Sequence, residues 1–184
     1  MSAHRGMLYT YTGKASFPEG APDLKSIAVS LAREGRYAGA GSYFWPVALH
    51  TFVVCDMLPE ELKIHGLLHD SPECITGDIP KPAKTDEIET FEEELLRSIY
   101  KDLDVRFPDQ WEREAVKRED RKALRGEVYV VGTAALKEFN ARCLEAEQLV
   151  RDYWRKYSYN DMLDANGAVQ QDFINKFHAY KLMI

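Results

Sequence analysis

The chain has 184 residues and a formal net charge of −6 at pH 7, with 45% hydrophobic and 29% charged residues. This composition indicates one globular domain, residues 1–184, and excludes a disordered chain. The acidic balance argues against a nucleic-acid polymer as partner, because binding to a phosphate backbone requires a basic face. No apolar run is long enough for a membrane helix, and the N-terminus lacks the apolar core of a signal peptide. We therefore expect a cytoplasmic protein with no membrane partner.

The N-terminal part predicts a short hairpin, a helix and a loop. Residues 7–17 alternate roughly around a Gly13–Lys14 turn, which indicates a small β-hairpin. Asp23 is a suitable N-cap for a helix that ends at Gly35. The next stretch, GRYAGAGSYFWP, is too rich in glycine for a regular helix. It is either a loop pinned to the core by its aromatic side chains or a loop that lines a substrate pocket.

The rest of the chain predicts helices. Pro46 and Pro59 each suit the first turn of a helix, and Pro72 should end the second of these helices. Apolar stripes at steps of three and four then predict helical segments over residues 85–99, 108–130, 133–157 and 169–177, the last after a turn at Asn166–Gly167. We therefore predict an all-α fold, a helical bundle of about seven helices with a small N-terminal β-hairpin.

The segment His65–Lys84, HGLLHDSPECITGDIPKPAK, concentrates the groups that could carry chemistry. His69 and Asp70 are adjacent, and imidazole with carboxylate is a donor set for Zn, Mn, Fe or Co. Consecutive helical side chains point about 100° apart, so these two can share one ion only near a helix end, which Pro72 makes feasible. Glu73 is either a general acid or base beside that ion or a surface glutamate at the helix end.

Further ligands must come from other helices. His50 lies on an apolar stripe, where a histidine is more often a core residue, but it faces a second histidine across a helical hairpin. His65 competes with it, because His65 and His69 are four residues apart and such pairs can bind one metal ion. Asp120 lies in the charged segment VKREDRKAL, where spacing alone favours a solvated carboxylate. Asp78, just ahead of a proline turn, is either a turn residue or part of the site.

These motifs resemble the HD-domain metal-dependent phosphohydrolases, and most closely their small deoxynucleotidase-like branch. The matching segments are RYAG (36–39), FWPVALH (44–50), HDSPECITGDIPKPAK (69–84) and VKRED (116–120). The HDxxE…GDxPxPxK run is specific, whereas an HD dipeptide alone carries no information. The fold that this resemblance implies is an HD-domain helical bundle.

The resemblance also implies a divalent metal ion, Zn, Co or Mn, and a role for individual residues. The implied site comprises metal ligands His50, His69, Asp70 and Asp120, catalytic acids Glu73 and Asp78, and substrate-binding residues Arg36, Trp45, Lys84 and Lys117. His65 is then left with a structural role. Two positions depart from the family pattern: Leu49 replaces a polar residue before the first histidine, and Pro72 replaces a small residue before Glu73.

The compact chain and the FWP before His50 most resemble the phage-type dATP triphosphohydrolases, which split dATP into deoxyadenosine and triphosphate. Those enzymes deplete dATP in phages whose DNA carries 2-aminoadenine. The resemblance thus implies a deoxynucleotide substrate, a homo-oligomer (dimer or hexamer) and, for a phage protein, the host cytoplasm. A 5′-deoxynucleotidase acting on deoxynucleoside monophosphates is the alternative within the branch. A non-catalytic sensor that binds metal and nucleotide is the alternative of another class.

Overall fold

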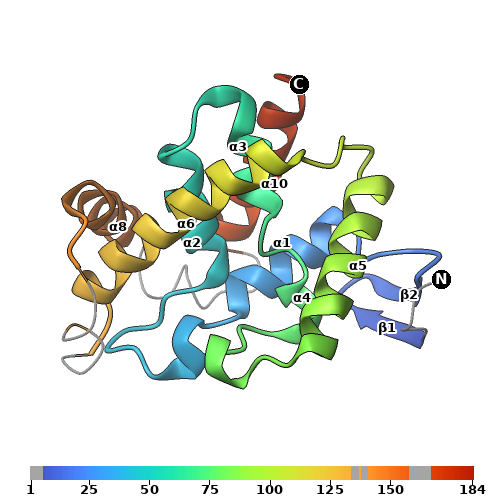
Figure 1. Ribbon diagram of the computed structural model, residues 1–184, viewed down its shortest axis with the longest axis horizontal. Coiled ribbons are helices and arrows are strands. Elements are labelled where there is room, and N and C mark those ends of the chain that lie inside the picture. Colours follow the sequence, from blue (N-terminus) through green and yellow to red (C-terminus); the bar gives the residue numbers. More distant parts are fainter. Residues whose placement is uncertain (1–5, 134–136, 138–140, 158–166) are drawn as a thin grey trace.

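The computed structural model describes residues 6–133, 137, 141–157 and 167–184. Its fold is all-α with a small N-terminal antiparallel hairpin, as predicted (Figure 1). The named elements are β1 (Gly6–Thr10), β2 (Gly13–Phe17), α1 (Leu24–Arg33), α2 (Val47–Asp56), α3 (Lys63–Leu68), α4 (Glu73–Thr76), α5 (Asp86–Asp102), α6 (Gln110–Val130), α8 (Leu144–Lys156) and α10 (Ala168–Lys181). In the described part of the chain, no helix is long and apolar enough to cross a membrane.

The hairpin is fastened to the helices at both of its ends. Asp23 caps α1 by accepting a hydrogen bond from the main-chain N–H of Ser26 (2.7 Å), and the hydroxyl of Thr12 in the hairpin turn also donates to Asp23. At the other end, Phe17 is buried and packs edge to face against Phe91 of α5, with ring centroids 5.2 Å apart. The predicted hairpin and the predicted cap are therefore confirmed.

Helix α2 forms the centre of the fold. Its residues from Val47 to Cys55 are all buried, so the helix is enclosed on every side. Helices α1, α3, α6, α8 and α10 pack around it, and Figure 1 shows α6 crossing the molecule in front of it. Every polar side chain between Val47 and Cys55 is thus placed inside the protein, which applies to His50.

Most helices begin within a few residues of the positions predicted for them. Thr85 caps α5 through a hydrogen bond from the main-chain N–H of Ile88, and Asp109 opens α6 with a capping box. Pro72 behaves differently from the prediction, because it does not simply stop a helix: it has right-handed helical backbone angles and immediately precedes α4. Leu136 and Phe139 of the predicted helical segment lie outside the described residues, as does Asn166 of the predicted turn.

Candidate metal centre

Three parts of the chain bring the four predicted metal ligands together. His50 lies on α2, His69 and Asp70 follow α3, and Asp120 lies on α6. Ligand atoms of His50, His69 and Asp120 all lie within 4.8 Å of one another, so this group could hold a metal ion. Asp70 joins it, since its Oδ2 lies 3.5 Å from Nε2 of His50 and 3.2 Å from Nε2 of His69.

The two imidazole rings are oriented through their Nδ1 atoms. Nδ1 of His50 lies 2.7 Å from a carboxylate oxygen of Glu127, and Nδ1 of His69 lies 2.8 Å from the carbonyl oxygen of Gly66. A carbonyl or ionised carboxylate only accepts, so each ring donates its Nδ1 proton and turns the Nε2 lone pair towards the other ring.

Both Nε2 atoms are buried and lack a hydrogen-bond partner among the described residues. Nε2 of His50 lies 3.1 Å from Oδ1 of Asp120, an ion-pair distance, but the two atoms form no hydrogen bond. A buried nitrogen without a partner is costly in free energy. A metal ion placed between the rings and the carboxylates would satisfy both nitrogens, so the residues present fit a divalent cation.

The charges of this group depend strongly on one another. Burial and Arg36 lower the pKa of His50, but the carboxylates of Glu127 and Asp120 outweigh them and raise it to about 10. Burial would raise the pKa of Asp70, yet the neighbouring imidazoles and guanidinium hold it well below its usual range. Positive charge is therefore favoured at the centre of the group, and a divalent cation would supply it in place of the imidazole protons.

Glu73 begins α4 immediately beside the ligands. Its main-chain N–H donates to the carbonyl oxygen of Asp70 (3.0 Å), so the helical course of the backbone continues through Pro72. Burial, reinforced by the Asp70 carboxylate, raises the pKa of Glu73 to about 9. Its Oε2 is buried without a hydrogen-bond partner in the described structure. A carboxyl group that keeps its proton at neutral pH can act as a general acid.

Arg36 and Asp78 meet at a turn of the chain. Nε of Arg36 lies 3.1 Å from Glu127, its Nη1 lies 3.6 Å from Asp70, and its side chain is only 10% exposed. Asp78 accepts a hydrogen bond of 2.6 Å from the main-chain N–H of Tyr37. The structure therefore gives both residues protein partners and places Arg36 next to a predicted metal ligand.

The position of Trp45 contradicts its predicted role in binding substrate. Its side chain is 1% exposed and belongs to the hydrophobic core. The main-chain N–H of Arg36 donates to the carbonyl of Trp45 (2.9 Å), and Gly35 pairs with Pro46, so the two ends of the loop are closed together. This closure directs Trp45 inwards. The alternative interpretation, a loop pinned by its aromatic side chains, describes Trp45 correctly.

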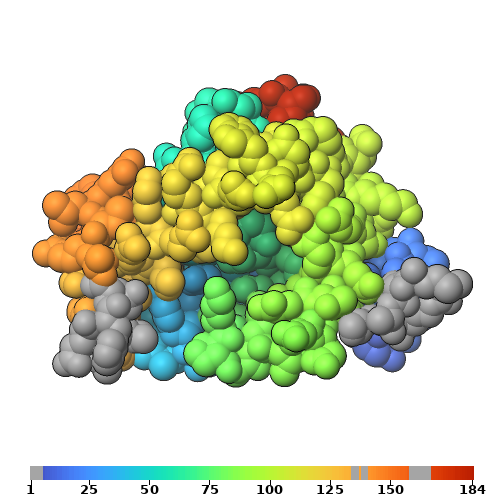
Figure 2. Space-filling view, viewed as in Figure 1, coloured from blue at the N-terminus to red at the C-terminus, as the bar shows by residue number. Residues whose placement is uncertain are grey.

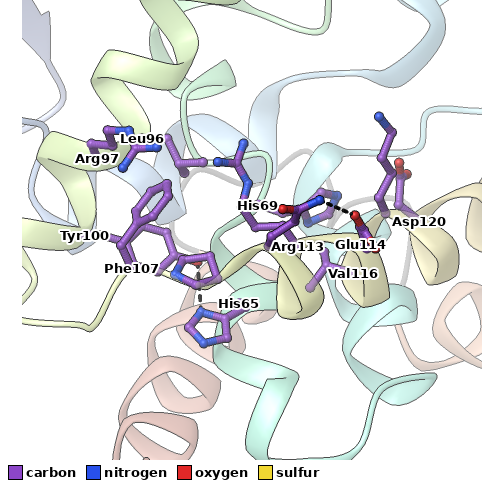
Figure 3. Close-up of a pocket in the computed structure, with 13 residues that line it drawn as sticks. His65, His69, Leu96, Arg97, Tyr100, Phe107, Arg113, Glu114, Val116 and Asp120 are labelled. Atoms are coloured by element: carbon purple, nitrogen blue, oxygen red, sulfur yellow. Dashed lines mark hydrogen bonds between the residues drawn. The ribbon is translucent and has the colours of Figure 1, made fainter.

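A cavity of about 770 Å³ opens beside the ligands His69 and Asp120. Figure 3 shows these two residues on one side of the cavity and Tyr100 and Phe107 on the other. In Figure 2 the surface is hollowed between α6 and the chain around α4 and α5. Atoms of the segment near residue 70 lie at the bottom of this hollow. Helices α5 and α6 thus form the walls of a space large enough for a nucleotide-sized ligand.

The two predicted phosphate-binding lysines differ in their surroundings. Lys117 lines the large cavity and forms no ion pair within the described part of the chain. Lys84 lines a smaller cavity of about 290 Å³ beside Asp70 and Glu73, where its Nζ lies 2.6 Å from Glu92. Lys117 is therefore the more available cation of the two.

His65 has the structural role that was expected of it. It is 1% exposed, its ring stacks on Tyr100, and its Nδ1 lies 3.2 Å from the Tyr100 hydroxyl. The group of residues that could hold a metal ion does not include it. The spacing of four residues between His65 and His69 therefore does not bring both histidines into that group.

The sequence interpretation missed Glu127, which is fully buried on α6. Besides its contacts with His50 and Arg36, it accepts a hydrogen bond of 3.1 Å from the hydroxyl of Tyr37. Glu127 lies seven residues after Asp120, a spacing that returns to the same face of a helix after two turns. That spacing is the sequence signal that could have revealed it.

Fold and site together define a helical protein with a candidate His/Asp metal centre. No family model matches the sequence. The chain is similar to a protein of Escherichia coli (strain K12) named "Uncharacterized protein YfdR", with 39% identity over 61 residues. This match covers 33% of the chain and 34% of YfdR, so it spans about a third of either protein. That name describes no activity.

Proposed function

We propose that the protein is a divalent-metal-dependent phosphohydrolase of the HD-domain type that acts on deoxynucleotides. The observation that carries the proposal is the convergence of the buried, unpartnered Nε2 atoms of His50 and His69 with the carboxylates of Asp70 and Asp120. Mixed imidazole and carboxylate donors with room for water suit Zn, Co or Mn.

The chain's own residues supply the rest of the proposed chemistry. A bound dication would act as a Lewis acid towards a phosphoryl group and would acidify water. Asp70 and Asp120 would hold that cation together with the two imidazoles, which their Nδ1 contacts keep in place. Glu73 would exchange a proton with the reacting water or the leaving group, since it adjoins Asp70 and its buried Oε2 has no hydrogen-bond partner among the described residues.

The large cavity supports a nucleotide as substrate. Its walls contain apolar side chains, Leu96, Phe107 and Val116 among them, which suit a nucleobase and sugar. Lys117 is exposed to the cavity three residues before Asp120 and suits a phosphate near the ion. By sequence resemblance we favour a dATP triphosphohydrolase, which converts dATP and water to deoxyadenosine and triphosphate. Assembly into a dimer or hexamer and a place in the host cytoplasm remain predictions.

The charges in the cavity favour a second candidate, a 5′-deoxynucleotidase. Arg97 and Arg113 both line the cavity, but both also pair with Glu93, at 2.7 and 2.8 Å. Among the described residues that line the cavity, Lys117 is then the basic side chain that forms no ion pair. Positive charge that is free to meet a phosphate is therefore limited, which suits a single phosphate better than a triphosphate chain.

The test is to incubate the protein with Co, Mn or Zn and a panel of deoxy- and ribonucleotides, as mono- and triphosphates. Release of triphosphate and deoxyadenosine from dATP supports the favoured activity, and inorganic phosphate from monophosphates supports the second candidate. A protein that binds metal and nucleotide but yields no product is a sensor, which overturns the enzymatic proposal. Asp70→Ala serves as the control, because it removes a ligand at the centre of the group.

A further inference from the structure

We infer that Glu127 is a positioning residue that holds the metal ligand His50 and the turn at Arg36–Gly39 in a single network. The inference rests on the metal centre of the proposed function and assigns a residue that acts on the ion through His50.

The two oxygens of Glu127 have separate partners. Oε1 lies 2.7 Å from Nδ1 of His50. Oε2 lies 3.1 Å from Nε of Arg36 and accepts the Tyr37 hydroxyl at 3.1 Å. Glu127 is 0% exposed, so bulk solvent does not reach these positions. One oxygen therefore contacts the proposed metal ligand His50, and the other contacts the residues of the turn.

The turn needs such support because its backbone is unusual. Tyr37 has a φ of 64° and Ala38 a φ of 50°, in the left-handed region that side chains other than glycine seldom adopt. Glu127 and Asp78 hold Tyr37 from opposite ends, through its hydroxyl and its main-chain N–H. Arg36 of the same turn also lies 3.6 Å from the ligand Asp70. The turn and the metal ligands are thus joined at two points.

Helix α6 consequently contributes to the centre twice. It supplies Asp120 directly, and two turns later it supplies the group that orients His50. A carboxylate on the far nitrogen of a metal-binding histidine fixes the ring and raises its basicity as a ligand. Loss of such a partner typically weakens metal binding by about 10–100-fold.

The experiment measures Co²⁺ affinity by calorimetry, together with the absorption spectrum of the bound ion. The test variant is Glu127→Gln, which keeps the shape and an acceptor oxygen but removes the charge. Glu147→Gln is the matched control, because Glu147 is also buried and paired with an arginine, Arg142, but lies on α8 and is not one of the groups that could hold a metal ion. Tyr37→Phe removes only the hydrogen bond between the turn and Glu127.

We expect Glu127→Gln to bind Co²⁺ about 10–100-fold more weakly with an altered spectrum, while Glu147→Gln matches the wild type. Tyr37→Phe leaves the contact between Glu127 and His50 in place and should weaken Co²⁺ binding less than Glu127→Gln does. A folded Glu127→Gln protein with wild-type affinity and spectrum overturns the inference. If that variant does not fold, ¹⁵N NMR of the zinc-loaded wild type decides. Zinc on Nε2 of His50 with the proton on Nδ1 supports the inference, and zinc on Nδ1 overturns it. Wild-type protein that binds no metal at all would instead overturn the proposed function.

Discussion

Glu73 has the surroundings of a proton donor, and replacing its carboxyl group by an amide tests that role. Glu73→Gln should lower kcat by about 10²–10⁴-fold, because the amide cannot transfer the proton. Metal affinity should stay close to wild type, since Glu73 is adjacent to the ligand set but outside it. Steady-state turnover and metal stoichiometry, measured on the same preparation, check this. Glu89→Gln, at the exposed edge of the same small cavity, is the control. Full turnover in a metal-loaded Glu73→Gln protein contradicts the assignment.

Substitutions of Lys117 and Lys84 should affect substrate binding to different degrees. Lys117 has no ion pair in the described part of the chain, whereas Lys84 is held by Glu92. Lys117→Met should therefore raise KM by about 10-fold or more, the worth of one hydrogen bond to a charged group. Lys84→Met should raise KM less. Steady-state kinetics on the two variants decide, and the opposite order would show that substrate phosphate lies in the smaller cavity.

Trp45 is expected to matter for stability and not for substrate choice. Its side chain is 1% exposed, so Trp45→Ala should lower the free energy of unfolding by about 3–5 kcal/mol. Tyr43, in the same loop, is 58% exposed, and Tyr43→Ala should change that free energy by less than about 1 kcal/mol. Urea denaturation measures both. Equal losses in the two variants would contradict the inward placement of Trp45.

At the scale of elements, the contribution of the α1 N-cap to the stability of the protein depends on pH. Burial raises the pKa of Asp23, but the hydrogen bonds from Thr12 and Ser26 outweigh burial and lower it. The folded-state pKa lies below the unfolded one of about 3.9, so the contribution of Asp23 is complete above that pH. It is lost as the pH falls through the lower, folded-state pKa.

Asp23→Ala should therefore cost about 1 kcal/mol of stability at pH 7, a typical value for a lost helix cap. The difference from wild type should shrink as the pH is lowered from 4 towards 2, because the protonated carboxyl no longer accepts well. Urea denaturation of both proteins across this range gives the comparison. A difference that stays constant to the acid end would show that the capping contact contributes through packing instead.

Elements whose signals are local could be predicted from the sequence. The apolar stripe of α5, its cap at Thr85 and the capping residue Asp109 of α6 all act within a few residues of the chain. The course of the chain at Pro72 was harder, because proline both ends one helix and suits the first turn of the next. Glu73 depends on that distinction, since only a continuing helical backbone brings it beside Asp70.

The whole molecule decides what spacing alone left open. The candidate ligands come from α2, from the end of α3 and from α6, and their meeting depends on how these helices pack. Spacing favoured a solvated Asp120 and allowed His65 as a ligand. Packing instead places Asp120 3.1 Å from His50 and turns His65 towards Tyr100. Glu127 was missed for the same reason, because its partners lie 77 and 90 residues away in the chain.

The most direct test of the metal centre is a Co²⁺ titration of the wild type beside two variants, Asp120→Ala and His65→Gln. We predict one ion per chain in the wild type, and binding that strengthens as the pH rises because protons and metal compete for the imidazoles. Asp120→Ala should bind Co²⁺ far more weakly, and His65→Gln should bind it like the wild type. Retained binding in Asp120→Ala with loss in His65→Gln would contradict the centre described here.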